Sequence, residues 1–137
     1  MKARSYTHRF GLFKRSQKAQ SLVEFALVVP ILILIVMGII EFGNLWMNMN
    51  IVTNASREGA RLAAVTAPDA GQVQASVNNI LNSANMTADS IIITGPVAVT
   101  NEVTVTVQVT YTPITGGIVP GLAGLVLQRA TTMRWEG

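Results

Sequence analysis

The sequence predicts an α+β fold in which a long N-terminal helix is followed by a second helix and a small antiparallel three-stranded sheet. Three patterns in the 137 residues indicate this. Residues 20–42 are almost wholly apolar, small and apolar residues then recur every three or four positions as far as Ala64, and Val alternates with Thr from Val103. These patterns are typical of a membrane span, an amphipathic helix and a half-buried strand, respectively.

The apolar run has the length of a transmembrane helix. Residues 22–40 hold one charged side chain, that of Glu24, and the stretch 27–37 offers no polar face to water. Nineteen helical residues extend roughly 28 Å, close to the hydrocarbon thickness of a bilayer. We therefore expect a span over residues 20–42, with Pro30 favouring a kink that membrane helices tolerate. A cleaved secretory signal is the alternative, but its apolar core would be shorter and a small-residue cleavage site would follow it.

The charges on either side of this run predict its orientation. Residues 1–19 carry six Lys or Arg and no acid, whereas residues 41–137 carry four Arg and six acids. Basic residues beside a span stay in the cytoplasm, so we expect a cytoplasmic N-terminus and an exported C-terminal part. The net charge of +3 thus divides into a basic leader and a mildly acidic body, and it requires no nucleic-acid surface. We expect the leader to be flexible or to lie on anionic headgroups.

Residues 43–66 predict a helical stalk that continues the span. Its apolar stripe becomes small from Ala55 onward, which lets another helix or a sheet approach closely. Two outcomes are open: the stripe docks on the protein's own sheet, or part of it packs against neighbouring subunits. Glu58 and Arg61 lie on the polar face at a spacing that allows an ion pair.

Residues 67–137 predict one small exported α+β domain. Pro68 breaks the chain, Asp69 is a helix N-cap, and Asn85 suits the end of the helix that follows. The expected elements are a helix over residues 70–84 and strands over residues 90–99, 103–111 and 127–135, the first strand being interrupted at Gly95-Pro96. The Gly/Pro-rich loop 113–125 carries five aliphatic side chains. It either covers one end of the core or forms an exposed apolar contact patch.

The residue inventory gives little support to catalysis. The chain has no cysteine, and its one histidine, His8, lies in the leader, so the exported part has neither a thiolate nor an imidazole. Asp69 and Asp89 are best interpreted as a cap and a turn residue. The glycine pairs after residue 115 lack the lysine and the strand–loop–helix setting of a phosphate loop. We expect no enzyme activity, no cofactor, no metal and no small-molecule substrate.

Three blocks together resemble the TadE-like family, the pseudopilins or minor pilins of the Tad (tight adherence) system that assembles Flp pili. The blocks are Q-S-L-V-E-F-A-L at residues 20–27, N-A-S-R-E-G-A-R at 54–61 and T-M-R at 132–134. The resemblance implies a pilin-like fold and a non-enzymatic role in Tad-type pilus assembly at the inner membrane. It points to a stalk motif that comprises Asn54, Arg57, Glu58, Gly59 and Arg61.

The same resemblance implies proteolytic processing of the type IV prepilin kind. A membrane aspartyl peptidase, the prepilin peptidase, would cut between Ala19 and Gln20 and leave Glu24 and Phe25 near the new N-terminus. The family usually has glycine where this chain has Ala19. The new ammonium group at Gln20 would neutralise Glu24 of a neighbouring subunit. The implied partners are membrane lipid, the peptidase, and other Tad assembly proteins and pilins. The alternative is an unprocessed single-pass anchor that presents its β-domain to an envelope ligand.

Overall fold

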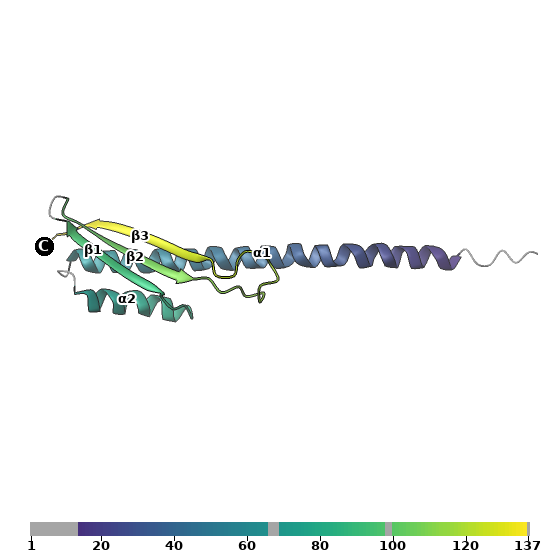
Figure 1. Cartoon of the computed structure of the whole chain (residues 1–137), viewed down its shortest axis with the longest axis horizontal. Coiled ribbons are helices and arrows are strands. Elements are labelled where there is room, and N and C mark those ends of the chain that lie inside the picture. Colours follow the sequence, from purple (N-terminus) through teal and green to yellow (C-terminus); the bar gives the residue numbers. More distant parts are fainter. Residues whose placement is uncertain (1–13, 66–68, 98–99, 137) are drawn as a thin grey trace, which may run out of the picture.

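The protein is a long helical rod with a small sheet and a second helix laid along one end. The structure, a computed structural model, describes residues 14–65, 69–97 and 100–136. Its elements follow the order α1 (Lys14–Val65), α2 (Ala70–Ser83), β1 (Ser90–Val97), β2 (Glu102–Thr110) and β3 (Val126–Arg134). In Figure 1 the sheet and α2 lie beside the C-terminal half of α1, and the N-terminal half projects alone. The predicted α+β arrangement is confirmed.

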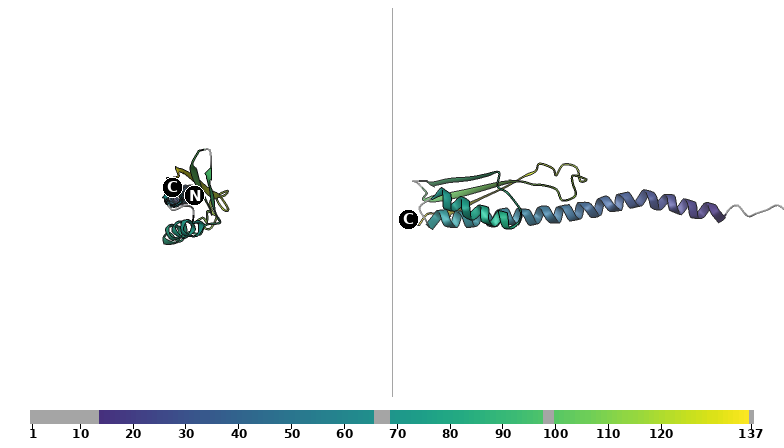
Figure 2. Two further views of the ribbon diagram at one scale, coloured as in Figure 1. Left: turned by 90° about the vertical axis from the view of Figure 1, so that its left-hand side faces the viewer. Right: turned by 90° about the horizontal axis from the view of Figure 1, so that it is seen from below.

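Helix α1 is one continuous element of 52 residues. It passes through Pro30 without a break and bends gently in the right-hand view of Figure 2. It begins at Lys14, so residues 14–19, which we expected to be flexible or to lie on anionic headgroups, are helical, and the first of these alternatives is wrong for them; the rest of the leader lies outside the described residues. The physical reason is local, because residues 14–29 contain neither Gly nor Pro and include strong helix formers.

Helix α2 starts and stops where the sequence predicted. The Asp69 side chain accepts a hydrogen bond from the backbone N–H of Gly71 at 3.0 Å, which caps the N-terminus. Asn85 takes the left-handed conformation just past the C-terminus, with φ of 54°. Pro68, the predicted helix breaker, lies outside the described residues.

The three strands form one antiparallel sheet with β2 in the centre. Val105 of β2 is paired with Ile93 of β1 on one side and with Thr131 of β3 on the other. The register of β1 shifts between Thr94 and Val97, which is the interruption predicted at Gly95-Pro96. The predicted continuation of this strand over residues 98–99 lies outside the described residues.

The core lies between one face of the sheet and the two helices. The inward side chains of β2 are all valines, and they pack on small residues of α1 and on the apolar side of α2. The buried set is Val52, Ala55, Ala60, Ala63, Ala64, Val73, Val77, Leu81, Val103, Val105, Val107, Val109, Tyr111 and Leu127. The small stripe of the stalk therefore docks on the protein's own sheet.

The N-terminal half of α1 has the opposite surface. Most of its large apolar side chains from Leu22 to Ile40 are 46–71% exposed, and Val29 and Met37 are half-buried. Among the described residues, α1 is the one helix long and apolar enough to cross a membrane. This uncovered apolar rod supports single-pass membrane anchoring, as the sequence predicted.

Candidate functional site

The predicted processing site lies within the first turns of α1. Ala19 and Gln20 are both helical and exposed. The Gln20 side-chain amide donates a hydrogen bond of 3.3 Å to the Glu24 carboxylate one turn later. The structure thus brings Gln20 and Glu24 together, and Phe25 next to them is 69% exposed. Because the backbone at the predicted cut is helical, a peptidase would have to unwind it locally.

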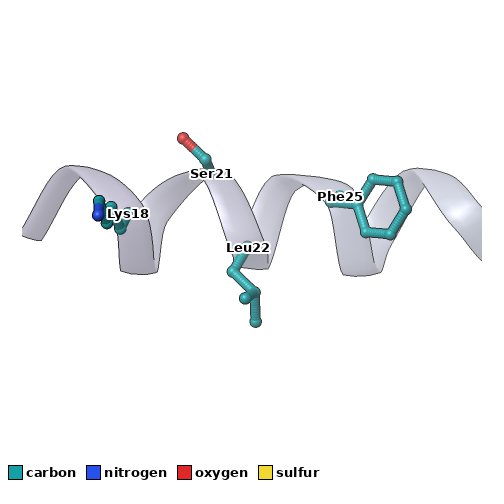
Figure 3. Close-up of a pocket in the computed structure, with 4 residues that line it drawn as sticks. All are labelled: Lys18, Ser21, Leu22 and Phe25. Carbon is teal, nitrogen blue, oxygen red and sulfur yellow. The ribbon is translucent and has the colours of Figure 1, made fainter.

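A shallow hollow occurs on the same stretch of helix. It is lined by Lys18, Ser21, Leu22 and Phe25, all of which belong to α1. Figure 3 shows these side chains on one open face of the helix, with Ser21 and Leu22 pointing in opposite directions. The hollow is therefore open helix surface, and this surface would face lipid or another helix in a membrane.

The stalk motif divides into a packed side and an open side. Gly59 is buried where α1 meets both α2 and the sheet. A Cβ atom at this position would lie 2.7 Å from Val77 Cγ2 and 3.1 Å from Val105 Cγ1. Glycine is therefore required by the close approach of α2 and β2.

The open side of the motif faces solvent. Asn54 and Arg57 are exposed, and Arg61 forms a bidentate ion pair with Glu58, at 2.9 Å for Nε–Oε2 and 2.6 Å for Nη2–Oε1. Hydrogen bonding to the Arg61 guanidinium lowers the pKa of Glu58, and the same contact raises the pKa of Arg61. The predicted pairing is confirmed.

A buried carboxylate that the sequence interpretation missed lies at the end of the apolar run. Glu41 is 0% exposed although it directly follows the uncovered Ile40. Its Oε1 accepts hydrogen bonds from the Tyr111 hydroxyl at 2.6 Å and from the Ile114 N–H at 3.1 Å. Its Oε2 accepts one from the Thr115 N–H at 3.1 Å. Glu41 thus fastens the start of the loop between β2 and β3 to α1.

Tyr111 completes this clamp. Its hydroxyl also accepts a hydrogen bond of 3.0 Å from the Asn44 side-chain amide. Burial, followed by the hydrogen bond to Glu41, raises the pKa of Tyr111, so the phenol stays a donor at neutral pH. One signal in the sequence could have found the site, namely an acid at the end of a span inside a continuing helix. Such an acid needs donors, but the loop that supplies them is some 70 residues away.

The third block of the resemblance lies at the far tip. The hydroxyls of Thr132 and Thr104 are 2.8 Å apart across the strands, Met133 packs against the core and Arg134 is exposed. Just beyond, the Glu136 N–H donates to the Ala64 carbonyl at 3.1 Å and holds the chain end against α1. This block thus closes the domain at the end farthest from the apolar half of α1.

A polar groove of about 430 Å³ opens between α1, the end of α2 and the end of β2. Side-chain amides of Asn44, Asn48 and Asn85 line it, together with Asp89. The Asp89 carboxylate already accepts a hydrogen bond of 2.7 Å from Thr110. Within the part of the chain that the structure describes, no three His, Asp or Glu side chains are grouped closely enough to hold a metal ion.

Comparison with known proteins finds a family match in the N-terminal part of the chain. A family model described as TadE-like protein matches residues 19–61. This confirms the predicted resemblance over the first two blocks, whereas T-M-R at residues 132–134 lies outside the match. No curated protein and no solved structure matches the chain.

Proposed function

We propose that this chain, whose residues 19–61 match the model of the TadE-like family, is a non-enzymatic pseudopilin or minor pilin of a Tad-type (Flp) pilus. The matched segment contains the predicted cut, Glu24, the apolar run and the stalk motif. The proposal thus rests on one observation: the matched segment is a single helix whose first half is uncovered and carries one acid.

The uncovered half of α1 is suited to a subunit that moves from lipid into an assembly. Large aliphatic side chains from Leu22 to Ile40 need an apolar environment, which either the bilayer or the helices of neighbouring subunits would supply. The basic residues before the span favour a cytoplasmic N-terminus, with the β-domain on the outer side of the inner membrane.

Processing gives Glu24 its function in this proposal. The prepilin peptidase hydrolyses the Ala19–Gln20 amide, which leaves a carboxylate on Ala19 and an ammonium group on Gln20. In the intact chain the Glu24 carboxylate accepts a hydrogen bond from the Gln20 side chain at 3.3 Å. An ammonium group from a neighbouring subunit is a stronger partner, because a carboxylate in an apolar surrounding is stabilised most by an opposite charge. Assembly therefore pairs one chain's N-terminus with the next chain's Glu24.

The open side of the stalk motif would contact other pilins or assembly proteins. Asn54 and Arg57 are exposed on the face of α1 away from the sheet, and the Glu58–Arg61 pair lies beside them. Gly59 serves the domain's own packing instead. One residue of the motif, Gly59, is thus needed for packing within the domain, and its other residues are free to contact a partner.

Two measurements test the assigned function. Mass spectrometry of the protein recovered from its native membrane should find an N-terminus at Gln20, and an intact Met1 in the assembled form would contradict processing. Glu24→Gln should abolish piliation while leaving membrane insertion intact, whereas Glu24→Asp should retain much of it.

The matched control for the second measurement is Glu102→Gln, at an exposed acid on β2 that should have no effect. If Glu24→Gln leaves piliation unchanged, the pilin assignment is wrong. The alternative of an unprocessed, membrane-anchored binding module would then account for the anchor and the β-domain.

A further inference from the structure

The loop between β2 and β3 exposes large apolar side chains and carries no charge. From Tyr111 to Gln128 the sequence contains no Asp, Glu, Lys or Arg. Leu122 packs against the core, but Ile114 is 65% exposed and Ile118 is 59% exposed. Of the two outcomes left open by the sequence, the structure therefore gives an exposed apolar patch for this part of the loop.

Hydrogen bonds hold the base of this loop in a fixed position. At its base the Tyr111 N–H donates to the Leu125 carbonyl at 2.7 Å, which brings its two ends together. Just inside the base, the Ile114 and Thr115 N–H groups both donate to the Glu41 carboxylate at 3.1 Å. These contacts fix the first part of the loop beside one position of α1.

That position is the end of the membrane-spanning surface. Glu41 follows directly on the apolar, exposed residues 22–40, and the exposed aromatic residues Phe42 and Trp46 come next. Tryptophan is enriched where a span meets the headgroups, so Trp46 marks this boundary. Figures 1 and 2 both show the loop reaching from the sheet along α1 toward the N-terminal half. Ile114, whose N–H contacts Glu41, therefore lies at the level where the span leaves the bilayer, and Ile118 follows four residues later in the same loop.

We propose that residues 112–125 form a second membrane-contact site, which places Ile114 and Ile118 in the headgroup–acyl boundary of the leaflet on the β-domain's side. The partner is lipid, because the loop is fastened to α1 where the spanning surface ends and has no charge to attract a polar protein face. The headgroup region is hydrated, so it tolerates loop backbone that the hydrocarbon interior would not. The Glu41 clamp sets the depth of the loop, and the loop in turn limits how α1 tilts.

The absence of cysteine allows a direct test with single labels. The full-length chain carrying Ile118→Cys, labelled with a nitrobenzoxadiazole fluorophore, is placed singly in lipid nanodiscs that contain lipids spin-labelled near the headgroup. We expect blue-shifted emission that these lipids quench. Ile33→Cys in the span should be quenched most by lipids spin-labelled deep in the acyl chain. Ala130→Cys, at an exposed position on β3, should not be quenched.

Each result decides the proposal. Ile118 emission that matches the Ala130 control overturns it, and so does blue-shifted emission that the lipids do not quench, because the cover would then be protein. Loss of quenching at Ile33 would also overturn it by removing the span itself. Since Glu24 takes no part in this readout, the loop's contact and the pilin assignment can fail separately.

A second pair of variants tests the clamp. In the Ile118→Cys background, Glu41→Ala removes the acceptor of three loop donors and should reduce quenching by headgroup-labelled lipids. Glu102→Ala, at an exposed acid on β2, should leave the quenching unchanged. Equal quenching in both variants would show that Glu41 does not set the depth of the loop.

Discussion

The two halves of α1 have opposite relations between side-chain size and burial. In the first half, large residues such as Leu22, Phe25 and Ile31 are 63–71% exposed. In the second half, small residues such as Ala55, Ala60 and Ala63 are 0% exposed. A helix that packs on its own sheet needs small residues for close approach, whereas a helix in lipid needs large apolar ones. One continuous helix thus lies in two environments, lipid and the protein's own core. The size of its side chains shows which half lies in which environment.

Gly59→Val should have the largest effect on this arrangement. A side chain there would collide with Val77 and Val105, so α2 and the sheet would be displaced from α1. Overpacking of this kind costs about 3 kcal/mol of unfolding free energy. Urea unfolding of the full chain in detergent, followed by the fluorescence of Trp135 in a Trp46→Phe background, measures it.

Gly43→Val is the control in the same helix, because a Cβ there would meet no atom within 4 Å apart from those of its own helical turn. We expect it to leave the stability of the domain unchanged. Equal losses in the two variants would mean that Gly59 acts through helix propensity and not through packing.

Two valines of α1, one in each half, test the difference between the buried and the exposed environment. Val52 is 0% exposed and Val28 is 60% exposed, both within α1. Val52→Ala should lower the unfolding free energy of the domain by about 2 kcal/mol, because it empties core volume. Val28→Ala should not change it in detergent. A comparable loss at Val28 would show that the first half is also packed against the domain.

The smallest expected effect concerns the Glu58–Arg61 pair on the outer face. Because the folded state lowers the pKa of Glu58, the pair stabilises the fold above the carboxylate's unfolded pKa. That stability is lost as the pH falls through the lowered pKa. Arg61 is 59% exposed, so screening by solvent keeps this contribution small.

Comparison of wild type with Glu58→Gln at about pH 7 and about pH 3 measures this contribution. The two proteins should differ slightly at the higher pH and converge at the lower one. A difference that grows on acidification would contradict the sign of the pKa shift.

Most of the fold could be predicted because its signals are local. The alternating Val and Thr residues of β2, the cap at Asp69 and the small stripe around Gly59 each follow from patterns within a few residues. The start of α1 was missed because basic charge was interpreted as a leader, although charge by itself does not oppose helix formation. The bounds of the helices and strands otherwise differ from the prediction by a few residues.

The candidate sites show where local reasoning ends. Glu24 is conspicuous because it interrupts an apolar run, and Glu58 because Arg61 follows at helical spacing. Glu41 looked like an ordinary acid at the end of the span, and nothing near it in the sequence supplies donors. Its partners, the Tyr111 hydroxyl and two loop N–H groups, come into reach only when β2 is placed on α1. Long-range pairing of this kind cannot be obtained from periodicity.

The unbroken length of α1 has a mechanical consequence. Fifty-two helical residues make a shaft of about 78 Å, with the sheet fastened along its outer half and no joint at the bilayer surface. Any displacement of α1 along its axis therefore moves the sheet by the same distance, because no flexible segment lies between them. Rotation of α1 about its axis also turns the β-domain. The angular orientation of the β-domain about this axis is therefore fixed while the N-terminal half of α1 is still in the bilayer.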